Sequence, residues 1–202
     1  MQTWLALSDA IDRFNRGMSR AAVWLVLLAA LLSAFNAAFR YFIEGMVKLT
    51  DKGRSYPWLQ SLLSWYSNNS NSFLEAQWYM FGGMVLLGAA YTLKMNEHVR
   101  VDLFYGWVSE RTRTWIDLFG TLFCLMPMCV LLIYFTWPWF LDSWRINEAS
   151  SNAGGLPRWP IKLLLPVGFV LVLIQGVSEA IKCVAALTTE YVRDQAYEKP
   201  VQ

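Results

Sequence analysis

The sequence has a single histidine, only three cysteines and no cluster of metal-ligating residues. Because His98 is the only histidine, a haem held between two histidines of this chain is excluded, and zinc sites need several His, Cys or carboxylate ligands. Cys124, Cys129 and Cys183 all lie inside apolar stretches, which predicts small buried hydrophobic side chains and no disulfide framework. We therefore expect no metal and no cofactor.

Charged residues are also scarce. They make up 16% of the 202 residues, compared with about 25% in an average soluble protein, and give a net charge of +2. The sequence contains no basic run, no glycine-rich phosphate loop and no nucleophile motif, so neither nucleic-acid binding nor enzymatic activity is expected. Apolar residues reach 56% and aromatic residues 16%, which is more than these charges can keep soluble unless part of the chain faces lipid.

Charged residues bracket four long apolar stretches of the chain. A helix that crosses the hydrocarbon core needs roughly 20 apolar residues, and helices satisfy all backbone polar groups within one segment. The sequence therefore predicts an all-α integral membrane protein with a single membrane domain and four transmembrane helices, at about 19–42, 75–95, 114–140 and 160–187.

Short interfacial amphipathic helices are expected outside the spans. Before the first span, apolar residues recur at spacings of three and four, which favours a helix on the membrane surface or against a neighbour: Trp4, Leu7, Ile11, Phe14 and Met18. The first loop, about 43–74, contains a second amphipathic stretch, PWLQSLLSWY. After it, Ser72-x-x-Glu75 has the form of a capping box that begins the second span.

The distribution of basic residues predicts the orientation of the chain. Four spans place both termini on one side of the membrane. Lys and Arg are somewhat more numerous in the termini and in the link between spans two and three than in the other two loops. By the positive-inside rule, both termini are expected in the cytoplasm.

Charge concentrates in the link between spans two and three. There His98, Arg100 and Asp102 alternate with two valines, so the three polar side chains share one side of an extended segment. Two interpretations stay open. The link is either an ordinary solvated loop or a docking patch for a partner, since a guanidinium group suits fixed carboxylate or backbone partners.

Three further charged residues are candidates for structural or docking roles. Arg40 closes span one and Glu75 opens span two on the same side, so the two can pair; the alternatives are Glu44 as the partner of Arg40 and the capping role for Glu75. Glu179 is expected to pair with Lys182 near a helix end. No span has an ionisable residue near its middle, so a substrate pathway through this bundle is not expected.

Several stretches, in this order, resemble the small permease subunit of tripartite ATP-independent periplasmic (TRAP) transporters. The most specific is the His-Val-Arg-Val-Asp element after the second span. The stretches are Glu75-Ala-Gln-Trp-Tyr, Gly88-Ala-Ala-Tyr-Thr-Leu-Lys, Glu97-His-Val-Arg-Val-Asp102, and Gly154-Gly-Leu-Pro-Arg-Trp-Pro followed by Leu-Pro-Val-Gly-Phe. The resemblance runs from about residue 20 to residue 187.

The resemblance implies a multi-pass subunit of a bacterial inner-membrane complex. In that family a large multi-span permease subunit carries the substrate, commonly an organic acid, together with sodium, and a periplasmic substrate-binding protein delivers it. The small subunit has no catalytic residues and is expected to act as a scaffold in the lipid bilayer. The alternative is a non-catalytic membrane-anchor subunit of another multi-subunit membrane enzyme or electron-transfer complex.

Overall fold

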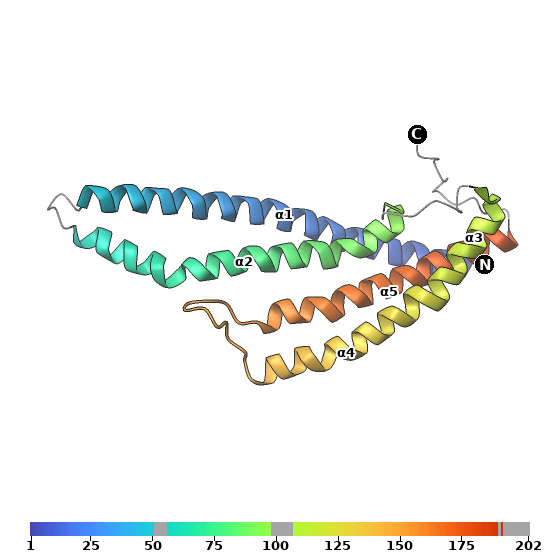
Figure 1. The fold of residues 1–202 in the computed structure, drawn as a ribbon. Helices are drawn as coiled ribbons and strands as arrows, with labels where there is room; N and C mark the ends of the chain where they lie inside the picture. Colours follow the sequence, from blue (N-terminus) through green and yellow to red (C-terminus); the bar gives the residue numbers. More distant parts are fainter. Residues whose placement is uncertain (51–55, 98–106, 190, 192–202) are drawn as a thin grey trace.

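The computed structural model describes residues 1–50, 56–97, 107–189 and 191 of the chain, and the only regular secondary structure among these residues is helical. The expected all-α class is therefore confirmed (Figure 1). The elements are α1 (Gln2–Thr50), α2 (Pro57–Met95), α3 (Glu110–Gly120), the π-helical turn η2 (Thr121–Leu125), α4 (Met126–Arg145) and α5 (Trp159–Thr188).

Three of the described helical stretches are long and apolar enough to cross a membrane, namely Gln2–Lys48, Glu110–Arg145 and Trp159–Thr188. The fourth predicted span, 75–95, forms the second half of α2. This half is less apolar because Gln77, two tyrosines and three glycines interrupt its aliphatic residues. Length and composition thus single out three stretches of the described chain rather than the predicted four.

Helix α5 is the centre of the bundle. It contacts α1, α2, α3 and α4, while α1 packs along α2 as a long antiparallel hairpin (Figure 1). Two glycines of α2 permit close packing. A Cβ atom on Gly82 would lie 2.7 Å from Ile161 Cδ1 of α5, and one on Gly83 would lie 2.9 Å from Leu25 Cδ1 of α1.

A small hydrophobic core forms where α3 and the start of α4 meet the second half of α5. It consists of Leu118, Ala180 and Cys183, with Met126 packed against it. All three cysteines are unpaired, and Cys129 and Cys183 are buried as expected. Cys124 is exposed, which corrects the expectation that it is buried.

The predicted first loop, 43–74, is wrong in its extent. Helix α1 continues to Thr50 and α2 begins at Pro57, so the amphipathic stretch is part of α2 and not a separate interfacial helix. The helices continue because aromatic residues of one pack on those of the other, for example Phe35 on Phe73 and Phe39 on Trp65. The predicted capping box is wrong as well, because Ser72 and Glu75 lie inside α2.

The N-terminal amphipathic segment is likewise continuous with the first apolar stretch within α1. Its apolar stripe does not face the bundle, since Trp4, Leu7 and Phe14 are exposed. A polar stripe of the same segment, formed by Ser8, Asp12 and Asn15, is buried instead. This inversion creates the first of the sites described below.

Candidate functional site

The carboxylate of Asp12 in α1 is the centre of a buried polar cluster. Its Oδ2 atom accepts a hydrogen bond from Lys182 Nζ of α5 at 2.8 Å and lies 3.1 Å from Lys94 Nζ of α2. Its Oδ1 atom accepts hydrogen bonds from Gln175 Nε2 at 3.0 Å and from Ser178 Oγ at 2.8 Å, both from α5. One side chain therefore joins the three helices.

Further hydrogen bonds extend this network along the α1–α5 contact. Asn15 Nδ2 donates to Gln175 Oε1 at 2.8 Å, and Gln175 Nε2 also donates to Glu179 Oε1 at 3.1 Å. The hydroxyl groups of Ser8 and Ser178 lie 2.6 Å apart. We call the whole set the Asp12 cluster: Ser8, Asp12, Asn15, Lys94, Gln175, Ser178, Glu179 and Lys182.

The formal charges of the Asp12 cluster balance, because it holds two carboxylates and two ammonium groups. Lys182 Nζ donates to Glu179 Oε1 at 2.9 Å, which confirms the predicted pair. Four charges with so little exposure would be costly unless they were paired and hydrogen-bonded, as they are here. No group of three or more His, Cys, Asp or Glu residues suitable for a metal ion occurs in the part of the chain that the structure describes.

Sequence reasoning missed Asp12 because it assigned the packing face of the N-terminal segment to the apolar stripe. Two signals could have found the cluster. Polar residues recur on the other face of α1 at spacings of four and three, and α5 carries a polar stripe near its C-terminal end: Ser8, Asp12 and Asn15 on α1, and Gln175, Ser178, Glu179 and Lys182 on α5. Two polar stripes at helical spacing predict a shared polar contact.

Glu75, a candidate from the sequence, holds the loop between α4 and α5 against α2. Its side chain is buried, with 5% of the residue surface exposed. Ser150 Oγ and Asn152 Nδ2, the latter at 2.9 Å, donate to Oε1, while the Leu156 backbone N–H donates to Oε2 at 2.6 Å. The carboxylate therefore replaces the hydrogen-bond partners that this loop would otherwise find in water.

Other residues of α2 bind the backbone of the same loop. Asn71 Nδ2 donates to the Ala153 carbonyl at 2.9 Å, Ser72 Oγ to the Gly154 carbonyl, and Tyr79 Oη to the Pro157 carbonyl at 2.8 Å. Together with the three bonds of Glu75, these contacts fix the loop along about two turns of α2. We call this arrangement the Glu75 clasp.

Arg40, the predicted partner of Glu75, is exposed on α1. It interacts electrostatically with Glu44, one of the alternatives that the sequence left open. Among the salt bridges of the described residues there is none between Arg40 and Glu75, whose oxygens bind the loop instead. The structure therefore does not bring these two sequence-predicted residues together.

A second anchor holds the other side of this loop on α5. Lys162 Nζ donates to Glu148 Oε2 and lies 4.4 Å from the ring centroid of Trp139 in α4. The hydrogen bond from Lys162 holds the pKa of Glu148 below its ordinary value of 4.5. Loop, α4 and α5 thus meet at one charged pair beside an aromatic ring.

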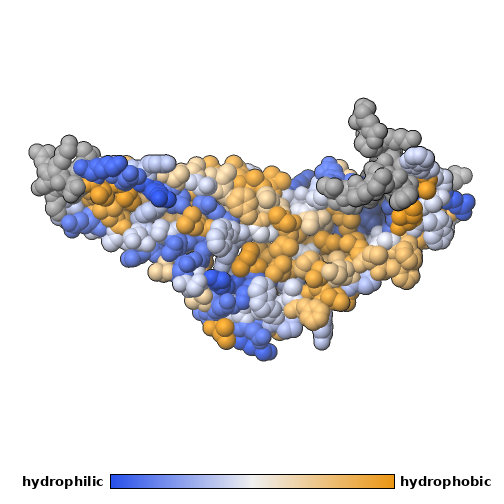
Figure 2. All heavy atoms as spheres, viewed as in Figure 1, coloured by the Kyte–Doolittle hydropathy of each residue, from blue (hydrophilic) through white to orange (hydrophobic). Residues whose placement is uncertain are grey.

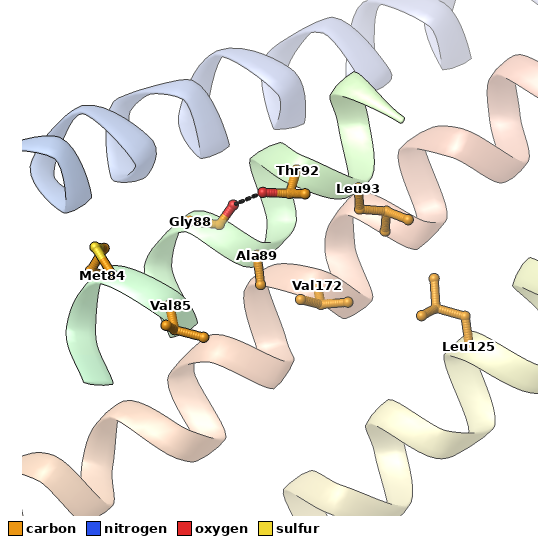
Figure 3. Close-up of a pocket in the computed structure, with 8 residues that line it drawn as sticks. All are labelled: Met84, Val85, Gly88, Ala89, Thr92, Leu93, Leu125 and Val172. Carbon is orange, nitrogen blue, oxygen red and sulfur yellow. Dashed lines mark hydrogen bonds between the residues drawn. The ribbon is translucent and has the colours of Figure 1, made fainter. Parts of the chain in front are cut away.

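A third feature is an apolar groove between α2 and the η2–α4 segment, with α5 as its floor (Figure 3). Its volume is about 600 Å³. The hydroxyl of Thr92 donates to the Gly88 carbonyl at 3.3 Å, which leaves the lining almost free of polar groups. We call it the α2–α4 groove, and its lining residues are Met84, Val85, Gly88, Ala89, Thr92, Leu93, Leu125 and Val172.

The predicted docking patch of His98, Arg100 and Asp102 lies outside the described residues, and its role remains a prediction. The neighbouring Lys94 is described, and the Asp12 cluster holds it in place. The residue that precedes the patch, Glu97, is exposed.

Comparisons with known proteins agree with the resemblance seen in the sequence. A curated relative from Pseudomonas aeruginosa, the C4-dicarboxylate TRAP transporter small permease protein DctQ, is 28% identical over 107 residues. The match covers 52% of this chain and 50% of the relative, so the chain spans about half the length of the curated relative that it matches. No solved structure matches the chain.

The family model for the DctQ component of tripartite ATP-independent periplasmic transporters matches residues 62–186. This segment contains the Glu75 clasp, the α2–α4 groove and the α5 part of the Asp12 cluster. Since the match covers more than half of the sequence, the chain belongs to the DctQ family, the small permease component of these transporters.

Proposed function

We propose that this chain is the scaffold subunit of a TRAP-type secondary transporter in a bacterial inner membrane. In this proposal a large permease subunit carries an organic acid together with sodium, and a periplasmic substrate-binding protein delivers it. The chain itself supports the large subunit and has no enzymatic activity. The name of the Pseudomonas relative, which specifies C4-dicarboxylates, supports an organic acid as the substrate.

The observation that carries this proposal is the Asp12 cluster. A group that binds and releases an ion or substrate has to exchange partners during transport. Asp12, Lys94 and Lys182 instead bind one another across three helices, and each is nearly buried. A charge-balanced network whose carboxylates and ammonium groups bind one another suits a fixed support for a moving partner.

The surface of the bundle supports a position in lipid. Hydrophobic residues gather over the middle of the molecule, and hydrophilic residues concentrate toward the end of the α1–α2 hairpin (Figure 2). Large apolar residues of α1 and α4 are exposed, as expected where helices face lipid or another subunit. We propose four spans, the second being residues 75–95 of α2, with both termini in the cytoplasm.

Reconstitution into liposomes tests the function. Vesicles that contain this chain alone should accumulate no labelled C4-dicarboxylate under an inward sodium gradient. Vesicles with the large subunit as well should accumulate it when the substrate-binding protein is added, and a potassium gradient serves as the control. Accumulation by the chain alone would refute the scaffold role.

The link between spans two and three is proposed as one contact with the large subunit. A hydrogen-bonded charge at an interface contributes about 2–5 kcal/mol when its partner is truncated. Arg100→Ala should therefore reduce co-purification of the large subunit without reducing membrane insertion, whereas Arg111→Ala should have much less effect. Equal effects of the two variants would favour the solvated-loop interpretation.

A further inference from the structure

We propose that the exposed side of η2 and α4 meets a transmembrane helix of the large permease subunit, and that a hydroxyl or amide group of this helix donates a hydrogen bond to the backbone carbonyl of Leu122. The inference rests on the proposed function and deepens it, because it assigns the face of the bundle that the partner covers.

The π-helical turn η2 leaves one backbone carbonyl without a donor in its own helix. The N–H of Met126 donates to the Thr121 carbonyl, five residues back, and so does not serve Leu122, its partner in a regular α-helix. The next residue along the chain, Pro127, has no N–H. No side-chain hydrogen bond to the Leu122 carbonyl occurs among the residues that the structure describes.

Pro127 explains why the helix widens at this point. In a regular α-helix the proline ring would clash with the carbonyl four residues earlier, that of Phe123. A turn that contains one more residue moves this carbonyl away from the ring and loses a backbone hydrogen bond. The local sequence therefore accounts for the lost donor of Leu122 but not for the group that replaces it.

The inner side of η2 packs on α5, and its outer side is exposed. Thr121 and Leu125 face Gly176 of α5, where a Cβ atom would lie 3.3 Å from Leu125 Cδ2. Leu122 and Phe123, which lie between them along the chain, are both exposed. A group that replaces the missing donor therefore has to come from outside this bundle.

The depth of the turn limits which group can donate. η2 lies inside the predicted span 114–140, and Trp115 and Trp139 near the ends of this span are typical of headgroup level. Lipid tails carry no hydrogen-bond donor, and an unsatisfied carbonyl is costly in hydrocarbon. An ordered water makes about three hydrogen bonds, which the apolar side chains of Leu122 and Phe123 do not offer. A polar side chain of a neighbouring helix is the donor that fits.

A second proline repeats the arrangement on the same side of α4. Pro138 removes the donor that an α-helix would supply to the Tyr134 carbonyl, and Tyr134 is exposed. Pro127 and Pro138 are eleven residues apart, which is about three turns, and both are exposed. One helix that lies along α4 can therefore supply donors at both levels, which no lipid chain can.

The proposed function supplies such a helix in the large subunit, which a scaffold has to contact. A second copy of this chain is the other source of a helix at this depth. The hydroxyl groups of Thr92 and Thr136 lie in the spans, but each already donates to a carbonyl of its own helix, Gly88 and Leu132 respectively. This favours the large subunit as the donor.

Photo-cross-linking in membranes tests which partner covers η2. A photoreactive phenylalanine analogue replaces Phe123 on η2 or Val23 on α1, which are similarly exposed, at 65% and 66%. The two positions lie at a similar depth, because a Cβ atom on Gly88 would lie 4.0 Å from Ala22, and Gly88 lines the same groove as Leu125. With the large subunit of the same transporter co-expressed, Phe123 should cross-link to it and Val23 should not.

Restoring the missing N–H provides the second test. Pro127→Ala supplies a donor within the helix, so a donor from the partner gains less there. Co-purification of the large subunit in mild detergent should fall by about three- to tenfold, as expected for one hydrogen bond between helices in a membrane. Pro160→Ala is the matched control, because the new N–H lies in the first turn of α5, where no helix carbonyl lacks a donor.

The infrared band of an isotope-labelled Leu122 carbonyl reports the hydrogen bond itself. A hydrogen bond weakens the C=O bond, so the band should shift to lower frequency when the large subunit is bound. An unchanged band in the assembled complex would show that Pro127 only shapes the helix and that the Leu122 carbonyl has no donor in the partner.

Different outcomes overturn different claims. If the wild-type chain co-purifies with the large subunit, but Phe123 cross-links only to lipid or to a second copy, or Val23 cross-links equally well, the exposed side of η2 is not the docking surface. If Pro127→Ala fails to insert into the membrane, the cross-linking and the infrared band decide. If the wild-type chain does not associate with the large subunit at all, the proposed function fails together with this inference.

Discussion

The carboxylate of Asp12 lies 2.8 Å from the ammonium group of Lys182, although 170 residues separate the two along the chain. This contact fixes the first helix of the chain to the last one. Lys94 on α2 binds the same carboxylate oxygen, so three helices depend on one acidic side chain.

Replacing Asp12 by alanine should destabilise the bundle strongly. The change leaves Lys94 and Lys182 with less negative charge nearby, and breaking a buried ion pair costs about 3 kcal/mol or more. Thermal unfolding of the purified protein in detergent measures the effect. Asp9→Ala, which removes an exposed carboxylate one turn earlier on α1, should change the melting temperature little. Equal losses for both variants would contradict the role given to the Asp12 cluster.

Glu75→Gln should release the α4–α5 loop from α2. An amide has one acceptor oxygen in place of the two carboxylate oxygens that bind Ser150, Asn152 and the Leu156 N–H. A buried donor left without its acceptor costs about 1–3 kcal/mol. Faster hydrogen exchange of the loop amides, with unchanged exchange in α5, is the expected result. Glu44→Gln, which affects only exposed interactions with Lys48 and Arg40, is the control.

Gly154→Ala should weaken the same loop for a steric reason. Gly154 has a positive φ of 69°, and a Cβ atom there would lie 1.8 Å from the Asn68 carbonyl oxygen. Gly45→Ala is the matched opposite, since a Cβ on Gly45 within α1 meets no atom within 4 Å. It should stabilise the protein by about 0.5–1 kcal/mol, so the two variants should shift the melting temperature in opposite directions.

The Glu148–Lys162 pair should make stability depend on pH in the acidic range. The pKa of Glu148 is lowered in the folded protein, so its carboxylate stabilises the fold at pH values above its ordinary pKa of 4.5. This contribution is lost as the pH falls through the lowered pKa. Melting temperatures from pH 7 to pH 3 should fall more steeply for the wild type than for Glu148→Gln. Parallel curves would show that the pair adds nothing to stability.

Local patterns in the sequence predict the parts of the structure that depend on neighbours along the chain. The helical class and the Glu179–Lys182 pair are confirmed because each follows from the spacing of residues along a helix. A charge run of period two, such as His98–Asp102, predicts a shared face but not its partner.

The features that were missed depend on contacts between distant helices. The Ser- and Asn-rich run near Ser72 is typical of a break, yet α2 continues through it because loop carbonyls accept hydrogen bonds from its side chains and aromatic rings of α1 pack beside it. Asp12 is not among the candidates from the sequence, because nothing near it along the chain shows that Lys182 of α5 lies beside it in the fold.

The α1–α2 hairpin extends well beyond the level at which the second predicted span begins. Phe35 contacts Phe73, so the level at which the second predicted span begins corresponds to about residue 34 on α1. Beyond that level α1 continues for about 15 residues, or about 22 Å at 1.5 Å per residue. The polar layer on each side of the hydrocarbon is only about 5–8 Å thick. In the proposed topology the hairpin is therefore a spacer that holds its described end, near Thr50, clear of the lipid headgroups.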